Sequence, residues 1–502
     1  MQPQNMNLSA LLEQYQKSPR LFQLTDRLSF ADKQKIFLKN LQGSSAEFVV
    51  SSVFMHANTQ QLNHLVVLND AEEAAYFHNT LENLTSALDL FYFPSSYKNR
   101  KNFKLLNSSH VMLRTETLMR LAAGGNRKII VSYPEALFEK VVLSKTLSSN
   151  IISIKTNDTI NLDSLLELFV MYGFSRTDFV YEPGQFALRG GILDIYSFGN
   201  EKPYRVELFG NDVDSIRIFD PETQLSERKL LQVSIIPNID TQFDSGEKVS
   251  LLEFLPENTI VWLKDWDVIK EKIYLQQEDL EGFIALLDDG YRMQNSEEED
   301  DTQVVKEIKW DDFVKHDIIE KQLQERHLVE FGFKPQLADY EIEFQTKPQP
   351  AFNRQFDLLI KDLKAHENAG YSIYIFAEQA KQLERLNSIF VDLNTEIQFV
   401  PVATSIHEGF IDEDLKAVCY TDHQIFQRYH KYRVKQAYNK NKALTLKTLR
   451  DLQPGDFVTH IDHGVGTYSG LQKIEVNGKM QEAVRIIYKD SDILYVNINS
   501  LH

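Results

Sequence analysis

Residues 172–237 read YGFSRTDFVYEPGQFALRGGILDIYSFGNEKPYRVELFGNDVDSIRIFDPETQLSERKLLQVSIIP, a run of short apolar–polar alternations interrupted by turn residues. The alternation is clearest in the segments 185–189 and 204–209, where a large apolar side chain recurs at every second position. Turns that begin at Gly190 and Gly210 separate these segments from those that follow, so the pattern predicts consecutive strands of one sheet. A sheet that buries only one face would leave the side chains between the apolar ones in water.

Three charged side chains fall on that outer face: Arg189, Arg205 and Glu207. Guanidinium groups pair with carboxylates through two parallel hydrogen bonds, so a face with spaced arginines suits an acidic protein partner. The alternative is that Arg205 and Glu207 belong to a cross-strand surface network that contributes little energy. Asp194 lies in the apolar run ILDIY and is expected to fix a neighbouring turn.

The glycines, charges and apolar positions of this stretch resemble those of a known domain. The series EPGQF-x-x-RGGILDI, then a basic residue, then VELFG-x-x-x-x-SIR-x-FDPETQ is similar to the protein-binding domain shared by the excision-repair protein UvrB and the transcription-repair coupling factors. The resemblance implies that this domain binds the repair protein UvrA. By position, the contact residues of UvrB fall on Arg176, Arg189, Arg205 and Glu207, whereas a further UvrB arginine falls on Ala187.

The composition of the whole chain limits its partners. It holds 502 residues with a net charge of −18, so phosphate backbones repel it except where basic side chains gather. We therefore expect no tight DNA binding by these residues alone. No apolar run reaches membrane-spanning length and the N-terminus has no signal core, which predicts a cytoplasmic protein without a membrane partner. The single cysteine, Cys419, lies in an apolar segment that predicts a buried strand and a structural thiol.

The first domain alternates strand and helix patterns, which predicts an open α/β layer, with a helix over residues 37–54. A nucleotide site there would need a glycine-rich loop that ends in Lys-Ser/Thr after a strand. The nearest segment is GSSAEFV (Gly43–Val49), which lacks a second glycine and the lysine, and the Glu47 carboxylate would oppose a phosphate. We therefore expect a nucleotide fold that serves as a scaffold and has lost ATP binding, as the resemblance to the coupling factors also implies.

Basic side chains gather in residues 428–450, which hold eight Lys or Arg and no acid. Arg428, Lys431, Arg433 and Lys435 are candidate nucleic-acid contacts, because basic groups interleaved with tyrosines suit phosphates and bases. A solvated interdomain helix that docks on acidic neighbours explains the same composition equally well.

The histidines do not form a recognisable metal-binding pattern. His366, His407 and His423 have no ligand partner at helical spacing, so we expect three separate surface residues. His460 and His463 flank Asp462 before a glycine-rich turn and are expected to shape that turn. The sequence thus predicts no metal site and no catalytic residue.

The last 52 residues predict a small all-β unit, with strands over 457–461, 467–476, 483–488 and 493–496. Their pattern PGD-x-V-x-H-x-DHG-x-G-x-Y-x-G-L, followed by D-x-LYV, resembles the RNA-polymerase-interacting domain of the coupling factors, which is related to the CarD family. The resemblance implies binding to the polymerase β subunit through an exposed strand. The apolar contact residue of the family falls on Ile474, for which a core position is the alternative.

We expect a multidomain fold of α/β and α+β units. The expected units are a UvrB-like α/β domain in two halves (1–137 and 241–339), an inserted α+β UvrA-binding domain (138–240), a small α/β domain (340–427), the basic linker (428–450) and a C-terminal SH3/Tudor-like β-barrel (451–502). This order resembles the amino-terminal part of a bacterial transcription-repair coupling factor.

The resemblance implies docking by this chain, with UvrA and the RNA polymerase β subunit as partners. Double-stranded DNA, ATP and Mg²⁺ would belong mainly to translocase domains outside these residues, so no cofactor is expected here. Two alternatives stay open. A UvrB-like ATP-dependent excision-repair protein would need a complete phosphate loop near Gly43, and a CarD-like transcription regulator would have an unrelated N-terminal body.

Overall fold

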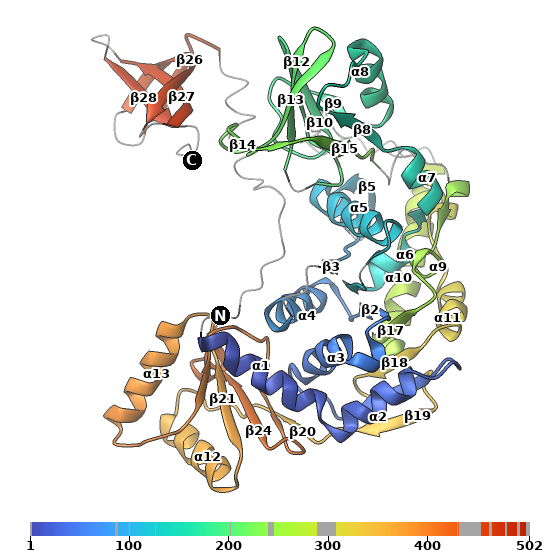
Figure 1. The fold of residues 1–502 in the computed structure, drawn as a ribbon, viewed down its shortest axis with the longest axis vertical. Helices are drawn as coiled ribbons and strands as arrows, with labels where there is room; N and C mark the ends of the chain where they lie inside the picture. The colour runs from blue at the N-terminus through green and yellow to red at the C-terminus, as the bar shows by residue number, and fades with distance from the viewer. Residues whose placement is uncertain are drawn as a thin grey trace.

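The computed structural model describes most of the chain. The described residues are 3–85, 89–99, 101–125, 127–200, 202–238, 245–288, 308–428, 430, 453–460, 464–476, 479–488 and 492–497. They form four sheets of four or more strands, so the expected mixed α/β organisation with several sheets is confirmed. In Figure 1 the seven-stranded sheet occupies the middle of the molecule, between the six-stranded sheet above and the five-stranded sheet below. No described helix is both long and apolar enough to cross a membrane.

The seven-stranded sheet is parallel throughout. Its strands, in spatial order, are β19 (Tyr340–Glu343), β1 (Lys35–Lys39), β18 (Leu328–Phe331), β17 (Thr259–Lys264), β2 (Asn63–Val67), β6 (Ile129–Ser132) and β3 (Leu90–Tyr92). Strands β17 and β18 lie at the centre and are almost wholly buried, which explains their continuous apolar sequence. Residues on both sides of the six-stranded sheet in the chain thus build one parallel sheet.

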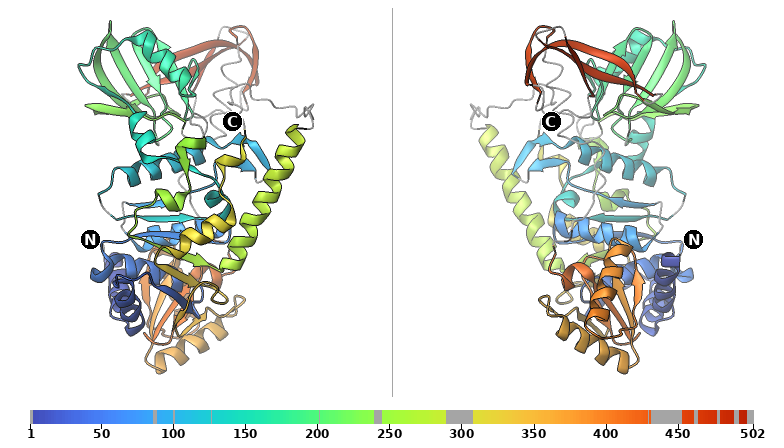
Figure 2. Two further views of the ribbon diagram at one scale, coloured as in Figure 1. Left: turned by 90° about the vertical axis from the view of Figure 1, so that its right-hand side faces the viewer. Right: turned by 90° about the vertical axis from the view of Figure 1, so that its left-hand side faces the viewer.

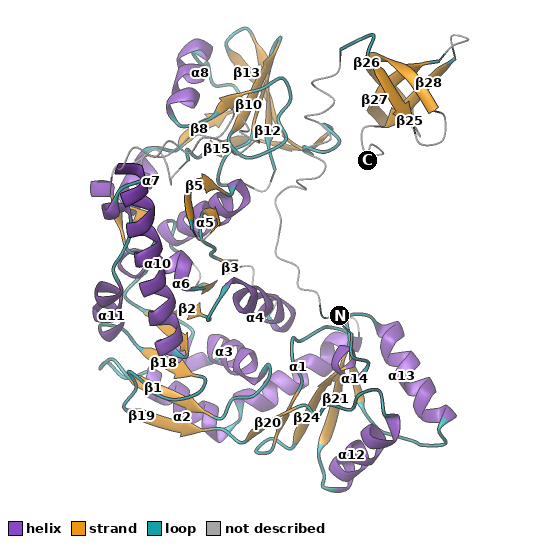
Figure 3. Cartoon of the chain, turned by 180° about the vertical axis from the view of Figure 1, so that it is seen from behind, coloured by secondary structure: helices purple, strands orange, loops and turns teal. Residues whose placement is uncertain are grey.

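Helices cover both faces of this sheet. They are α2 (Pro19–Leu28), α3 (Ser45–Met55), α4 (Ala71–Leu84), α5 (Ser108–Ala122), α6 (Pro134–Phe138), α7 (Ser144–Ser149), α9 (Leu251–Phe254), α10 (Trp266–Asp288) and α11 (His316–Gln324). Helices α3 and α4 lie on one face of the sheet, and α10 and α11 lie on the other (Figures 1 and 3). Figure 2 shows the long helix α10 in yellow-green along the outside of this domain.

The expectation of a single helix over residues 37–54 is wrong. Residues 35–39 form β1, which pairs with β18 on one side and with β19 on the other. Helix α3 begins only at Ser45, after a turn in which Gly43 has a φ of 52°. The segment KIFLK is a short apolar run, and strands from distant parts of the chain decide its conformation.

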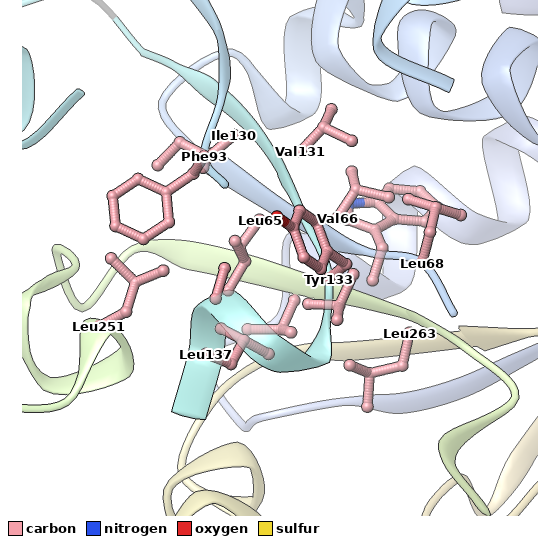
Figure 4. Close-up of a cluster of buried hydrophobic side chains, with 14 of the residues drawn as sticks. Leu65, Val66, Leu68, Phe93, Ile130, Val131, Tyr133, Leu137, Leu251 and Leu263 are labelled. Carbon is pink, nitrogen blue, oxygen red and sulfur yellow. The ribbon is translucent and has the colours of Figure 1, made fainter. Parts of the chain in front are cut away.

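The core between the sheet and its helices is aliphatic and aromatic. Figure 4 shows Leu65 and Val66 of β2 beside Ile130 and Val131 of β6, with Leu137 of α6 packed against the same cluster. Two short antiparallel pairs complete the domain: β4 (Tyr97–Asn99) with β5 (Asn102–Leu106), and β7 (Val141–Val142) with β16 (Lys248–Val249).

The six-stranded sheet is the unit that the stretch 172–237 predicts. Its strands are β14 (Ser226–Leu230), β13 (Asp212–Phe219), β12 (Tyr204–Phe209), β11 (Ile192–Ile195), β10 (Gln185–Arg189) and β9 (Ser175–Arg176). The helix α8 (Leu162–Met171) covers one face, and β8 (Ile152–Lys155) pairs with β15 (Gln232–Ile235) beside it. The Asn161 side chain caps α8 by accepting a hydrogen bond from the Ser164 amide.

The five-stranded sheet belongs to the small α/β domain. Its order is β20 (Thr346–Pro348), β23 (Phe410–Asp412), β24 (Ala417–Thr421), β21 (Ser372–Phe376) and β22 (Val400–Val402). The helices α12 (Phe356–Asn368), α13 (Ala380–Asp392) and α14 (Asp422–Ile425) pack against it, and Cys419 is buried in β24 as expected. Strand β19, whose residues fall within the range expected for this domain, pairs instead with β1 in the seven-stranded sheet.

Helix α1 (Pro3–Gln16) packs on the five-stranded sheet, although it precedes that sheet by more than three hundred residues in the sequence. Leu11, Leu12 and Tyr15 share one buried cluster with Phe376 and Phe410. The Tyr15 hydroxyl donates a 2.9 Å hydrogen bond to the Asp412 carboxylate at the same interface.

The C-terminal unit is a four-stranded antiparallel sheet in chain order. Its strands are β25 (Phe457–His460), β26 (Gly464–Val476), β27 (Lys479–Ile487) and β28 (Ile493–Asn497). Four strands were expected here, and β26 and β27 extend further along the sequence than expected. The closure of this sheet into an SH3/Tudor-like barrel stays a prediction.

Candidate protein-docking face

The strand register divides the six-stranded sheet into two faces of different chemistry. Phe186, Ile195 and Tyr204 are paired across β10, β11 and β12, and they point into the core beneath α8. The positions between them line the opposite face. Two cross-strand rows lie there: Ala187, Asp194, Arg205, Arg217 and Lys229 in one, and Arg189, Ile192, Glu207 and Ser215 in the other. We call the side chains of Arg189, Asp194, Arg205, Glu207 and Arg217 the charged face.

Asp194 is the centre of the charged face. Its side chain is fully buried, and its two oxygens accept hydrogen bonds from two arginines. Arg205 binds it through Nε to Oδ1 at 2.7 Å and through Nη2 to Oδ2 at 2.8 Å. The expectation that Asp194 fixes a turn is therefore wrong, because its register partner in the next strand is Arg205.

Arg205 is largely buried, which differs from the sequence expectation. Its side chain is only 13% exposed, and its Nη1 donates a 3.0 Å hydrogen bond to the carbonyl oxygen of Gln224. Its guanidinium also lies 4.5 Å from the centre of the Phe219 ring. The reason is a small second core of Val180, Ala187, Tyr196 and Phe219, which covers this part of the charged face.

Arg189 is the more accessible arginine of the pair. Its side chain is 34% exposed, and its Nη2 donates one 2.8 Å hydrogen bond to Oδ2 of Asp194. The guanidinium lies 4.4 Å from the centre of the Phe179 ring. The turn that carries Phe179 is itself fixed, because the Thr177 hydroxyl donates to the Phe179 carbonyl oxygen at 2.9 Å.

Glu207 has its own partners in the neighbouring strand. The Ser215 hydroxyl donates to its carboxylate at 2.5 Å, and Nη2 of Arg217 lies 3.3 Å from the same oxygen. The cross-strand network considered from the sequence is present, because Arg205 pairs with Asp194 of β11 and Glu207 with Arg217 of β13, although the Arg205 pair is buried. Sequence reasoning missed Arg217, although the alternation in residues 212–219 places it in phase with Ser215.

Arg176 lies at the edge of the sheet, in the two-residue strand β9. Its register partner is Phe186, which belongs to the face beneath α8, so the strand position of Arg176 differs from that of Arg205 and Glu207. Its exposed side chain nevertheless shares a cavity of about 330 Å³ with Arg189. The same cavity is lined by Thr177, Asp178, Phe179 and Leu188.

The loop after β1, where the sequence places a degenerate phosphate loop, is packed against the small α/β domain. The Ser44 amide donates a 3.0 Å hydrogen bond to the carbonyl oxygen of Glu408, and the Glu408 amide donates to the Ser44 hydroxyl at 3.1 Å. A Cβ on Gly43 would lie 2.6 Å from the Gly409 carbonyl oxygen. Glu47 is buried beside this contact, and burial raises the pKa of its carboxyl to about 8.

The expectation that His407 and His423 are separate surface residues is wrong. The His423 ring stacks on His430 with centroids 4.4 Å apart, and the His407 ring stacks on Tyr76 of α4 at 3.7 Å. Burial lowers the pKa of His407 and of His423 to about 4. Within the described residues no three potential metal ligands are arranged as a metal site.

Most of the other predicted contact residues lie at the edge of the described structure or beyond it. Arg428 pairs with the Asp422 carboxylate and lies 5.0 Å from the centre of the Phe426 ring. Lys431, Arg433 and Lys435 lie outside the described residues. The backbone of Ile474 is in β26, paired with Gln481 of β27, and its side chain is likewise outside the described part.

Comparisons with known proteins agree with this arrangement. Residues 152–240 match the model of the UvrB interaction domain, and residues 452–502 match that of the CarD-like/TRCF RID domain. The chain is 24% identical to the transcription-repair-coupling factor of Staphylococcus aureus strain Mu50 over 94% of its own length. It is 24% identical to that of Staphylococcus haemolyticus strain JCSC1435 over 98% of its length.

In both comparisons the aligned region is 46% of the relative, so the chain spans about half the length of the curated relatives that it matches. The charged face lies within the first matched domain and Ile474 within the second. The chain is thus similar to the transcription-repair-coupling factors along nearly its whole length, and it carries a UvrB interaction domain and a CarD-like/TRCF RID domain.

Proposed function

We propose that the chain is a docking module for transcription-coupled repair, which binds UvrA through the charged face and RNA polymerase through its C-terminal sheet. The observation that carries the proposal is the presence of both matched domains in one chain. Two binding surfaces on one chain raise the local concentration of each partner near the other. Recruitment of repair proteins to stalled polymerase needs this property and no chemistry by the module itself.

The charged face supports UvrA as the first partner. Arg189 and Glu207 are each about one-third exposed, so they are accessible from outside while their backbones are fixed in a sheet. Fixed arginine and carboxylate groups favour a partner with complementary charges and discriminate against others. Arg176 extends this surface at the sheet edge through the cavity that it shares with Arg189.

RNA polymerase, through its β subunit, is the proposed partner of the C-terminal sheet. Residues 471–476 of β26 pair only with β27 among the described strands, since β25 pairs with residues 464–467, and a sheet edge of this kind can accept a further strand. By resemblance, Ile474 supplies the apolar contact. Ile474→Arg should abolish binding to the isolated β subunit while the circular dichroism of the sheet is preserved.

We also propose that the loop at Gly43 binds no nucleotide and that this chain hydrolyses no ATP. Phosphate loops hold phosphates with free backbone amides and a lysine. Here the Ser44 amide already donates to Glu408, and the loop offers a buried Glu47 carboxyl and no lysine. Binding of ATP and Mg²⁺, and most contacts to double-stranded DNA, would then belong to the region that the relatives have in addition to the aligned part.

Binding measurements with purified UvrA and with the polymerase β subunit test the proposal directly. Arg189→Glu should weaken UvrA binding by roughly tenfold or more without lowering the melting temperature much, because a third of the Arg189 side chain is exposed. Lys361→Glu on α12, in the small α/β domain, is a control with the same charge change. Unchanged UvrA affinity in Arg189→Glu would refute the assignment of the charged face. Nucleotide titration of the same chain tests the third claim, and saturable ATP binding would favour the UvrB-like alternative.

A further inference from the structure

We infer that Asp194 and Phe179 are positioning residues for Arg189, and that Arg205 is an internal brace which does not itself contact the partner. This inference rests on the proposed function and divides the roles of residues that the resemblance treats alike. Under it, Arg189 presents its guanidinium to a carboxylate on UvrA, and Arg205 acts only through Asp194.

The hydrogen bonds of Arg205 are made within the domain. Its Nε and Nη2 bind Asp194, and its Nη1 binds the Gln224 carbonyl oxygen, so each of its three nitrogens already has an acceptor. The Phe219 ring lies beneath the guanidinium, and the side chain is 13% exposed. A partner carboxylate would have to displace a buried ion pair to reach Arg205, which is costly in a medium of low polarity.

The three groups Arg189, Asp194 and Arg205 together have a net positive charge. The fully buried Asp194 carboxylate carries one negative charge, and the bidentate pair with Arg205 neutralises it. Arg189 adds a second guanidinium to Oδ2 through a single nitrogen, so the three groups together keep a charge of plus one. That charge is located on Arg189, the only member of the three that is substantially exposed.

The Arg189 guanidinium is held in place by two neighbouring side chains. The hydrogen bond to Asp194 holds Nη2, and the Phe179 ring lies 4.4 Å from the guanidinium carbon. The guanidinium group of Arg189 is therefore fixed before a partner binds. Within the described residues, Nε and Nη1 of Arg189 have no hydrogen-bond acceptor. A preorganised arginine binds a carboxylate with a smaller loss of side-chain entropy than a mobile one.

The cavity beside Arg189 defines the chemistry of the ligand. Arg176 and Arg189 line it together with Asp178, so the lining side chains carry two positive charges and one negative charge. The remaining charge of plus one suits a single aspartate or glutamate side chain of the partner. Phe179 and Leu188 supply apolar walls, so such a carboxylate would be partly shielded from water and would bind more strongly.

A double-mutant cycle on UvrA affinity tests the inference. The variants are Arg189→Ala, Asp194→Asn and the double variant, measured with purified UvrA at fixed ionic strength. We expect each single variant to weaken binding by roughly tenfold, and Asp194→Asn to have no further effect once Arg189 is removed. A purely structural role of Asp194 would instead weaken binding by the same factor in both backgrounds, and that result would overturn the inference.

Further variants make the cycle decisive. If Asp194→Asn does not fold, Phe179→Leu replaces it, because this change removes the ring beneath Arg189 and leaves the ion pairs intact. We expect the effect of Phe179→Leu on UvrA affinity to vanish in the Arg189→Ala background, and persistence of the effect would overturn the inference. Arg217→Ala, on the same face and paired with Glu207, is the matched control and should not couple to Asp194→Asn. Unchanged affinity in Arg189→Ala would refute the proposed docking face itself, which is a separate result.

Discussion

Arg205 and Asp194 lie opposite each other on the adjacent strands β12 and β11, and their ion pair is bidentate and buried. Arg189 reaches the same carboxylate from β10 but stays partly in water. Two arginines with the same partner therefore have different energetic roles. Buried ion pairs contribute little net stability when complete, yet the loss of one partner leaves an uncompensated charge.

We predict that Arg205→Ala destabilises the fold far more than Arg189→Ala. Removal of Arg205 should cost about 3–5 kcal/mol of unfolding free energy, because Asp194 stays buried with only a single bond from Arg189. Removal of the more exposed Arg189 should cost less than about 1 kcal/mol. Urea unfolding of the two variants, followed by circular dichroism, measures the difference. Equal losses of unfolding free energy would mean that Arg189 stabilises the buried Asp194 carboxylate as much as Arg205 does.

A second prediction concerns the pH dependence that Glu47 confers. Burial raises the pKa of its carboxyl from 4.5 to about 8, so the folded state binds a proton that the unfolded state releases above pH 4.5. This contribution to stability is complete below pH 4.5 and is lost as the pH rises through about 8. Glu47→Gln cannot lose a proton, and it should be more stable than the parent chain by ~2–4 kcal/mol at pH 8.5.

The check on Glu47 is the melting temperature of both proteins between pH 4.5 and 8.5. The two curves should converge at the acidic end and diverge as the pH rises. Glu413→Gln, which changes a carboxylate on the surface of the small domain, serves as the control and should show no such divergence.

A third prediction concerns the stacked histidines His407, His423 and His430. Burial lowers the pKa of the first two from 6.5 to about 4, while Lys264 and Arg428 act in the same direction and Glu378 opposes them at His430. A lowered pKa means that their stabilising contribution is present above pH 6.5 and is lost as the pH falls to about 4.

His407→Phe keeps a ring against Tyr76 and removes one of these titrating groups. The loss of unfolding free energy between pH 7 and pH 4.5 should shrink by ~1–3 kcal/mol in this variant. An identical pH profile of unfolding free energy in the parent chain and in His407→Phe would contradict the prediction, because it would mean that His407 does not contribute to the pH dependence.

A fourth prediction separates backbone conformation from packing at the loop after β1. Gly43 and Gly124 both have positive φ, of 52° and 66°, but only at Gly43 does an added methyl group meet another domain. Gly124→Ala should therefore cost about 1 kcal/mol, the price of the left-handed backbone alone. Gly43→Ala should cost roughly 2–4 kcal/mol, because the methyl group would lie 2.6 Å from the Gly409 oxygen. Thermal unfolding of the pair measures the contribution of the contact between the domains.

The sequence predicts the faces of the six-stranded sheet well, because period-two alternation directly encodes which side chains share a face. Arg189, Arg205 and Glu207 do lie on one face, as expected. The alternation cannot show what covers that face. The burial of Arg205 depends on Phe219 and on the Gln224 carbonyl, whose positions are set by loops rather than by strand periodicity.

Long-range pairing explains the remaining differences. Residues 35–39 become a strand because β18 and β19, about three hundred residues later, pair with both of their edges. The meeting of His407 and His423 depends in the same way on the loop that carries His407 to α4 and on helix α14, which places His423 against His430. Local sequence patterns contain no information about such distant partners.

Helix α1 gives the small α/β domain a dependence on the beginning of the chain. Leu11, Leu12 and Tyr15 complete the hydrophobic layer over Phe376 and Phe410, so residues 346–427 expressed alone would leave that layer open to water. The same interface closes a loop of nearly the whole described body, with Tyr15 and Asp412 separated by 397 positions. Such closure is slow, and a ribosome must release residues past 412 before α1 can pack on this sheet, so the apolar side chains of α1 lack this partner until then.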